Sequence, residues 1–200
     1  QVLAIVNSWD EAKVITKPGV DPIVLNVNKT SSVLKFFKIY GSKIDAVIMY
    51  VGGFETDQKI RGDESSENNE SPVNINTWYF FVQALLPFMN HKRAGKIVLL
   101  GSKETSSIDD ALQTGGYSVS KNALLFLADL INNSNPGSKI RANVLIPQYF
   151  NYPEEGEITH VDRYHLINPE TVANTIQFIF SNSGKHFIQE VVPFESSLSE

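Results

Sequence analysis

The sequence predicts an α/β fold in which a doubly wound parallel sheet is covered by helices on both faces. Short apolar segments alternate with longer segments of helical periodicity, which is the pattern of repeated strand–helix units. The apolar segments are nearly continuous, as expected for parallel strands that are buried on both faces. The chain has 200 residues, 42% of them hydrophobic, so we expect one domain spanning residues 1–200.

The first half of the chain predicts three strands and two helices. The strands are expected at residues 2–6, 23–27 and 44–51. Gly19 and Pro22 interrupt the chain between the first two strands. A short helix starts after the first strand, and a second helix is expected to be capped by Thr30 or Ser31.

The second half of the chain continues the alternation. Its strands are expected at residues 95–102, 139–147 and 187–194, and its helices at residues 74–89, 117–131 and 172–180. Residues 55–72 are polar and acidic, which is typical of a solvated loop. Residues 151–167 are rich in Glu, Tyr and His and form a second exposed connection.

Three side chains are expected to meet at one edge of the predicted sheet. Ser102 ends a buried strand at its carboxyl end, where open α/β sheets hold ligands. Tyr117 and Lys121 are four residues apart, so a helix places them on one face. A nearby ammonium makes a phenol more acidic, and a serine hydroxyl can hold a carbonyl oxygen while the phenol exchanges its proton. The set predicts hydride transfer at a carbonyl, although the Tyr–Lys spacing alone also fits a surface tyrosine and a solvated lysine.

In these segments the chain resembles the short-chain dehydrogenase/reductase family. The helix from Asn74 has its asparagine near the start and a Leu-Pro pair near the end, like the central helix of that family. A Gly-Lys-Ile-Val strand then leads to Ser102 at the family's spacing. Residues 139–147 and 168–173 are similar to the strand after the catalytic helix and to the start of the late helix, and residues 151–167 lie where the family has the segment that covers the substrate. The resemblance runs from about Val2 to Phe194 and implies a Rossmann-like fold of this family's type.

The resemblance also implies roles for individual residues. Ser102 would orient the substrate oxygen, Tyr117 would exchange the proton, and Lys121 would make Tyr117 more acidic and hold the nicotinamide ribose. Asn74 would order a water in a proton relay, with Asn76 as an alternative assignment. The cofactor would be NADP or NAD. Besides Tyr117 and Lys121, its expected contacts are Asn7, Asn26, Val27, Val51, Gly52, Gly53, Pro147 and Gln148.

The chain departs from the family pattern at the turns that bind the nucleotide. The family's first strand, its glycine-rich turn and its first helix, which cradle the cofactor pyrophosphate, have no counterpart in this sequence. We therefore expect a fragment of a longer protein, with a degenerate family member as the alternative. The family's Asn-Asn-Ala-Gly turn falls on residues 49–52, where only Gly52 is kept, and Gln148 replaces the glycine that usually follows Pro147.

The choice between NADP and NAD depends on the end of the first predicted strand. An acidic residue there hydrogen-bonds the 2′-hydroxyl of NAD and repels the 2′-phosphate of NADP. Asn7 and Ser8 hold this place, so neither that repulsion nor an arginine clamp is expected. Lys13 fits a solvated helix face, and the Asn26 amide can accept a hydrogen bond from adenine. We predict a slight preference for NADP, smaller than about tenfold.

Composition and charge argue against several classes of function. The net charge is −5 and no Lys/Arg cluster occurs, which argues against nucleic-acid binding. The sequence has no Cys, and its four His lack the spacing of metal ligands, so we expect no metal site. No apolar run has membrane-span length and no signal peptide is visible, so we expect a cytoplasmic protein without a membrane partner. The apolar helices from Asn74 and Tyr117 predict a homodimer or homotetramer.

The leading prediction is an oxidoreductase for a small-molecule carbonyl or alcohol, and two alternatives stay open. The missing glycine-rich turn also fits a non-catalytic nucleotide-binding or regulatory protein on the same fold. Gly52-Gly53-Phe54 and residues 188–192 are similar to dihydropteridine reductase, which reduces a quinonoid pterin. Ser102 counts against that sub-family, because a non-hydroxylic residue is expected there.

Overall fold

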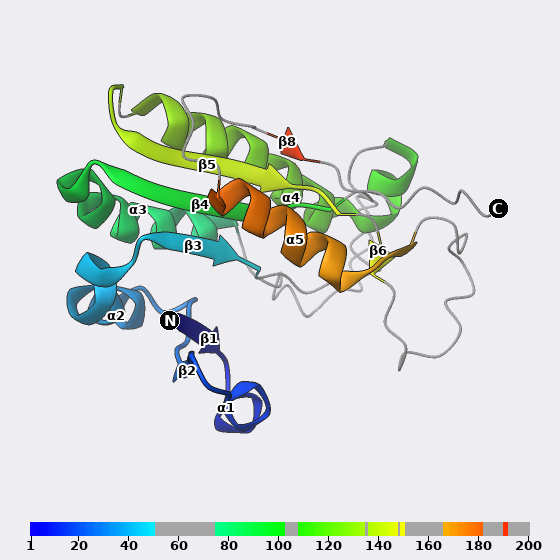
Figure 1. Ribbon diagram of the computed structural model, residues 1–200. Helices are drawn as coiled ribbons and strands as arrows, with labels where there is room; N and C mark the ends of the chain where they lie inside the picture. The colour runs from blue at the N-terminus through cyan, green and yellow to red at the C-terminus, as the bar shows by residue number, and fades with distance from the viewer. Residues whose placement is uncertain are drawn as a thin grey trace.

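The computed structural model describes residues 1–50, 75–102, 108–134, 136–147, 149–150, 166–181 and 190–191. Its elements in chain order are β1 (Val2–Val6), α1 (Trp9–Ile15), β2 (Val20–Val24), α2 (Thr30–Tyr40), the 3-10 helix η1 (Gly41–Lys43), β3 (Ala46–Met49), α3 (Ile75–Lys92), β4 (Ala94–Leu100), α4 (Ile108–Ser134), β5 (Lys139–Leu145), β6 (Tyr149–Phe150), β7 (Leu166–Ile167), α5 (Pro169–Ser181) and β8 (Glu190–Val191). Figure 1 shows helices on both sides of the strands, which confirms the predicted α/β class.

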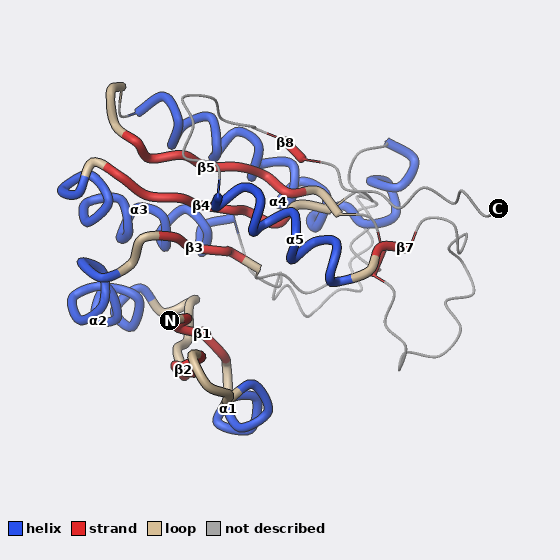
Figure 2. Tube along the Cα trace, in the orientation of Figure 1, coloured by secondary structure: helices blue, strands red, loops and turns tan. Residues whose placement is uncertain are grey.

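The named strands pair in parallel in three groups. β1 pairs with β2, β6 pairs with β7, and the largest group has the order β3-β4-β5-β8. Among the described residues, no strand lies between β1 and β3, and Figure 2 shows the β1–β2 pair set apart from the group that contains β3. In the doubly wound order the first strand of the fold belongs at this place. The described strands therefore fit the part of the doubly wound order that follows its first strand.

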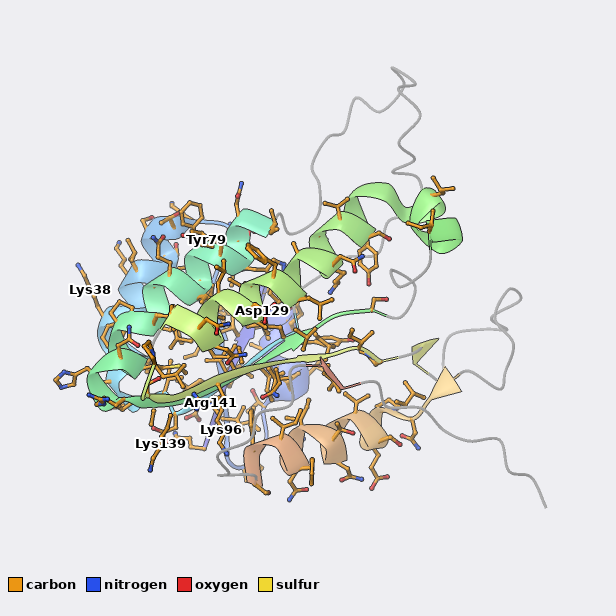
Figure 3. The ribbon with its side chains drawn as sticks, turned by 90° about the horizontal axis from the view of Figure 1, so that it is seen from above. Lys38, Tyr79, Lys96, Asp129, Lys139 and Arg141 are labelled. Atoms are coloured by element: carbon orange, nitrogen blue, oxygen red, sulfur yellow. The ribbon has the colours of Figure 1, made fainter. Side chains whose placement is uncertain are left out.

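Strand β4 contributes to a hydrophobic core on each of its faces. Ile97 and Leu99 belong to a core that includes side chains of α2, α3 and α4. Val98 and Leu100 belong to a second core with α5. Figure 3, seen from above, shows α3 and α4 on one side of the strands and α5 on the other. This two-sided cover explains why the strand reads as a continuous apolar run in the sequence.

Two side chains fasten the covering helices to the sheet. The Asn132 amide of α4 donates to the Ala142 carbonyl of β5 over 2.9 Å and accepts from the Ala142 N–H over 2.8 Å. Lys96 of β4 points toward α5 (Figure 3) and donates to the carbonyl of Phe180 in the last turn of that helix. A cation at this end of a helix complements the helix dipole.

The start of the chain differs from the prediction in two places. β2 covers Val20–Val24 instead of residues 23–27, so Pro22 lies inside the strand. In the described part of the chain β2 pairs with β1 alone, and an edge strand tolerates a proline without an N–H donor. The prediction that Thr30 or Ser31 caps the second helix is wrong, because Lys29 holds the cap position without a side-chain hydrogen bond.

The strand predicted at residues 2–6 matches β1, and those predicted at residues 44–51, 95–102 and 139–147 are correct in place but too long at one or both ends. Of the strand predicted at residues 187–194, only β8 lies in the described residues. β3 ends at Met49 and β5 ends at Leu145, since the backbone leaves the ladder before the apolar run stops. The loop predicted at residues 55–72 and most of the segment at 151–167 lie outside the described residues. Each helix in the described ranges is too short or too polar to serve as a membrane span.

Candidate active site

The helix that carries Tyr117 and Lys121 follows a break in α4. Gly115, which lies between the two ends of α4, has φ 33° and ψ −105°, which is outside the helical range. A positive φ of this kind favours glycine, because a side chain would strain the backbone. The break separates the first turns of α4 from the segment that runs to Ser134. It agrees with the prediction that a helix opens at Tyr117.

Lys121 is buried, and its ammonium lies at the carboxyl end of β4. Its Nζ donates to the Leu100 carbonyl over 3.1 Å, and the residue is 9% exposed. The same Nζ is 5.5 Å from the ring centroid of Tyr117, which is half-buried. The structure therefore brings the predicted Tyr–Lys pair together at the predicted sheet edge and excludes the alternative that Lys121 is a solvated surface residue.

Burial has an electrostatic consequence for Lys121. It lowers the pKa of the Lys121 ammonium from 10.5 to about 8, because the charged form loses hydration in the protein interior. The ion pairs of the described residues are Lys13–Asp10 and Lys92–Asp45, and neither includes Lys121. At pH 7 the ammonium is still mostly charged, so it can stabilise negative charge that develops nearby.

The ends of β4 and β5 are held close together beside Lys121. Half-buried Ser102 follows β4 and buried Pro147 follows β5. The Gly101 N–H donates to the Leu145 carbonyl over 2.8 Å, which continues the strand pairing beyond β4. A Cβ at Gly101 would lie 3.1 Å from Cγ1 of Ile146, closer than most side-chain contacts. Glycine thus lets the backbones that carry Ser102 and Pro147 approach each other.

The residues predicted to meet the adenosine lie after β1 and β2. Asn7 is exposed, and Val27 packs against the main core. The Asn26 side-chain oxygen accepts a hydrogen bond from the Asn28 N–H at 2.9 Å, so it closes a local turn. Thr77 of α3 donates to the Asn28 side-chain oxygen at 2.8 Å and ties this turn to the central helix. The predicted site residues Asn74, Val51, Gly52, Gly53 and Gln148 lie outside the described residues.

Two residues near the site were not predicted from the sequence. The Glu11 carboxylate accepts a hydrogen bond from the Asn7 N–H over 2.9 Å, at the end of β1. The Ser8 hydroxyl accepts from the Glu11 N–H and caps α1, which is one half of a capping box, while the Glu11 carboxylate reaches one residue further back to Asn7. The second residue, Trp78, lies against Lys121, with its ring centroid 5.4 Å from Nζ.

Lys13 is paired within its own helix, and of the four histidines only His91 lies in the described residues. Lys13 pairs with Asp10 over 2.8 Å on the exposed face of α1, as the sequence indicated. Within the described ranges, no group of three or more His, Asp or Glu side chains lies close enough to hold a metal ion.

Comparison with protein families identifies the chain. A family model described as short chain dehydrogenase matches residues 10–160, which is more than half of the sequence. The chain belongs to the short-chain dehydrogenase family. This membership confirms the resemblance seen in the sequence and supports an oxidoreductase activity for the protein.

Solved structures of other proteins show the same fold as this short-chain dehydrogenase. Serine dehydrogenase from Escherichia coli matches with a TM-score of 0.78 and 13% identity, covering 100% of this chain and 88% of that one. Alcohol dehydrogenase from Thermococcus sibiricus, complexed with 5-hydroxy-NADP, matches with a TM-score of 0.73 and 18% identity, covering 99% and 86%. A short chain dehydrogenase from Burkholderia cenocepacia, in complex with NADP, matches with a TM-score of 0.76 and 14% identity, covering 96% of this chain and 76% of that one. Comparison with curated proteins gives no match.

Proposed function

We propose that this chain is an NAD(P)-dependent oxidoreductase that acts on a carbonyl or alcohol group of a small molecule. The observation that carries the proposal is the buried Lys121 ammonium, fixed by the Leu100 carbonyl at the carboxyl end of β4 and facing the Tyr117 ring. A desolvated charge stabilises a neighbouring phenolate more strongly than a charge in water does. Tyr117 is therefore suited to give a proton to a substrate oxygen or to remove one.

The remaining roles rest on the resemblance to the family and on the place of each residue in the chain. Ser102 follows β4 at the same sheet edge, and we assign its hydroxyl to the substrate oxygen. We assign Asn74, which precedes α3, to a proton relay that ends at Lys121. In the direction of reduction, Tyr117 donates its proton to the substrate oxygen and Lys121 stabilises the phenolate that is left.

The residues at the sheet edge fit a nicotinamide cofactor. Lys121 offers an ammonium with donors that Leu100 does not use, Tyr117 offers a phenol, and Pro147 is buried at the same sheet edge. Gly101 leaves room for the strand ends to pack closely. We assign Tyr117, Lys121, Pro147 and Gln148 to the nicotinamide side. The turn residues Val51, Gly52 and Gly53 and the strand-end residues Asn7, Asn26 and Val27 are assigned to the rest of the nucleotide. The cofactor, when bound, supplies or accepts the hydride.

We propose NADP or NAD as this cofactor, with a slight preference for NADP. Two of the structural relatives are described as complexes with NADP or a modified NADP, and their identity to this chain is low. The preference itself rests on the neutral side chains of Asn7 and Ser8 after β1.

Substitution of Tyr117 tests the proposed reaction. Tyr117→Phe should lower turnover by about 10²–10⁴-fold, because loss of a positioned acid–base group costs this much, while cofactor affinity stays near that of the parent. Turnover is followed by absorbance at the nicotinamide band with a panel of carbonyls, alcohols and a quinonoid pterin. Tyr79→Phe is the matched control, since Tyr79 is an exposed tyrosine of α3.

The same assay separates the alternatives. Turnover of the pterin alone would identify a pterin reductase, and cofactor binding without turnover of any substrate would identify a non-catalytic protein. Turnover of Tyr117→Phe within twofold of the parent would remove Tyr117 from the mechanism.

We also propose that the protein is a homodimer or homotetramer built on α3 and α4. These helices lie side by side (Figure 3), and they expose large apolar side chains on their outer faces: Tyr79, Phe80, Phe126 and Leu130. Exposed apolar patches of this kind mark association surfaces. Light scattering at micromolar concentration should report a dimer or larger, and Phe126→Asp should shift it toward the monomer. A parent protein that is monomeric at this concentration contradicts the proposal.

A further inference from the structure

Trp78 of α3 lies directly against the buried ammonium of the proposed site. The Lys121 Nζ is positioned over the indole ring, 5.4 Å from its centroid. A cation within about 6 Å of an aromatic face is attracted by the ring quadrupole, and tryptophan is the strongest of the aromatic partners. Trp78 is 2% exposed, so water does not weaken this attraction.

The ammonium has few other partners of its own. It carries three donors, and one of them goes to the Leu100 carbonyl over 3.1 Å. Among the described residues no carboxylate forms an ion pair with Lys121. Trp78, Leu100 and Lys121 come from α3, β4 and α4, so three elements together fix the position of Nζ.

Among the side chains that the structure describes, the charged groups of α3, β4 and α4 are directed elsewhere. Lys96 of β4 donates to a carbonyl of α5 on the opposite face of the sheet. Lys92 of α3 pairs with Asp45 at the start of β3. Asp129 follows Lys121 by two turns of α4, which is about 12 Å along the helix axis. Tyr117 is the titratable side chain that faces the ammonium.

We propose that Trp78 is a positioning residue of the active site, whose indole face holds the Lys121 ammonium in its charged form beside Tyr117. Among the described side chains, Trp78 takes the place of the carboxylate counter-ion that a buried cation usually has. An aromatic face attracts the charge without occupying a hydrogen-bond donor, so the donors that Leu100 does not use stay available to a ligand. This inference rests on the proposed function, because a positioned ammonium matters only if Tyr117 exchanges a proton.

A direct titration of Lys121 tests the role of the indole. The protein is labelled with ¹³Cε-lysine, the Lys121 signal is assigned by its loss in Lys121→Met, and its titration is followed by NMR. Trp78→Leu should lower the pKa of Lys121 by about one unit, because the attraction to the ring favours the charged form. Trp78→Phe keeps a weaker aromatic face and should give less than half of that shift.

Phe81→Leu is the matched control for the titration. Phe81 is a buried aromatic residue of the same helix, but its ring packs on Phe37, with centroids 4.9 Å apart. It should leave the Lys121 titration unchanged. An equal shift in Phe81→Leu would mean that any loosening of the core moves Lys121, and no shift in Trp78→Leu would mean that the indole does not hold the charge. Either result overturns the proposal.

A second measurement covers the case in which Trp78→Leu fails to fold. The chain has two tryptophans, so a Trp9→Phe background leaves Trp78 as the single site for 5-fluorotryptophan. Fluorine weakens the ring quadrupole with little change of volume, and the pKa of Lys121 should fall by a few tenths of a unit. An unchanged titration there overturns the proposal.

The titration is separate from the test of the proposed function, since it needs neither substrate nor cofactor. In an active enzyme the alkaline limb of the rate profile should move to lower pH in Trp78→Leu by the same shift as the titration. A shifted titration in a protein without turnover would contradict the oxidoreductase and leave the role of Trp78 in holding the charge intact.

Discussion

The strand pairs β4–β5 and β1–β2 are both parallel, yet they differ in how much of them is buried. In β4 and in β5 five of seven residues are buried, whereas every residue of β1 and of β2 is half-buried or exposed. Hydrogen-bond pattern does not explain this, because both pairs have the same one. The difference lies in the helices that cover the strands, since helices pack on both faces of β4.

This difference separates two kinds of chemistry in the proposed site. Lys121 and Tyr117 stand at the end of the buried pair, where a charge loses hydration and acts strongly on its neighbour. Asn7 and Glu11 stand at the end of the exposed pair, where water screens charges. Changes near β4 should therefore affect stability and catalysis strongly, and changes near β1 should adjust binding only slightly.

The largest expected effect compares truncation in the two strand pairs. Leu99→Ala removes a side chain of β4 that is 0% exposed, and it should lower the free energy of unfolding by about 2–5 kcal/mol. Ile5→Ala removes a half-buried side chain of β1 and should cost about 1–2 kcal/mol. Urea unfolding of both variants measures the difference. Equal costs would show that cover does not distinguish the two strand pairs.

A smaller effect is expected from the pH dependence of the buried charge. The pKa of Lys121 is about 8 in the folded protein and 10.5 without burial, so between these values the unfolded chain holds the proton that the folded protein has released. The free energy of unfolding contributed by this group therefore rises with pH across that window, by up to about 3 kcal/mol. Lys121→Met lacks this contribution. Its free energy of unfolding should therefore fall relative to that of the parent as the pH rises from 7 to 10.

Exposed Lys13 provides the control for this pH experiment. Lys13→Met removes one positive charge from the exposed surface of α1 and leaves the surroundings of Lys121 intact, so it controls for the loss of a lysine charge alone. If the difference in free energy of unfolding between Lys121→Met and the parent stays constant between pH 7 and pH 10, Lys121 keeps its proton in the folded protein and burial does not lower its pKa.

The smallest expected effect concerns the exposed pair and the choice of cofactor. The Glu11 carboxylate accepts from the Asn7 N–H at the end of β1, where a 2′-phosphate would meet negative charge. Glu11→Gln should therefore shift the affinity ratio toward NADP by roughly two- to fivefold, a small factor because the charge is exposed. Fluorescence titration of both cofactors measures the ratio. Asp10→Asn is the control, since Asp10 is already paired with Lys13, and an equal shift in both variants would show a general charge effect.

The sequence predicts those parts of the fold that are determined by local pattern. The apolar runs of β4 and β5 and the four-residue spacing of Tyr117 and Lys121 were correctly interpreted, because periodicity reflects burial directly. The boundary of β2 was misplaced, because Pro22 acts as a breaker except in an edge strand, and strand order is a tertiary property.

The two contacts that refine the site differ in how predictable they were. The Glu11 contact with Asn7 is local, because the two residues are four apart at the start of a helix that Ser8 caps. The contact of Trp78 with Lys121 joins two helices that are separated by β4 in the chain. Nothing in the spacing of an apolar helix tells which of its aromatic residues faces a cation.

The pairing partners also set the order in which the chain can fold. Val2 pairs with Val20, whereas Ala94 pairs with Lys139, so β4–β5 closes a loop about two and a half times as long as that of β1–β2. Closing the longer loop costs about 0.8 kcal/mol more free energy, because more chain entropy is lost before any contact forms. We expect β1–β2 to pair early and reversibly, and the buried pair to form late, as is usual for parallel sheets with distant partners. Pulse-labelled hydrogen exchange should thus protect the β1 amides before those of β5, although the β5 amides are the slower to exchange in the native protein.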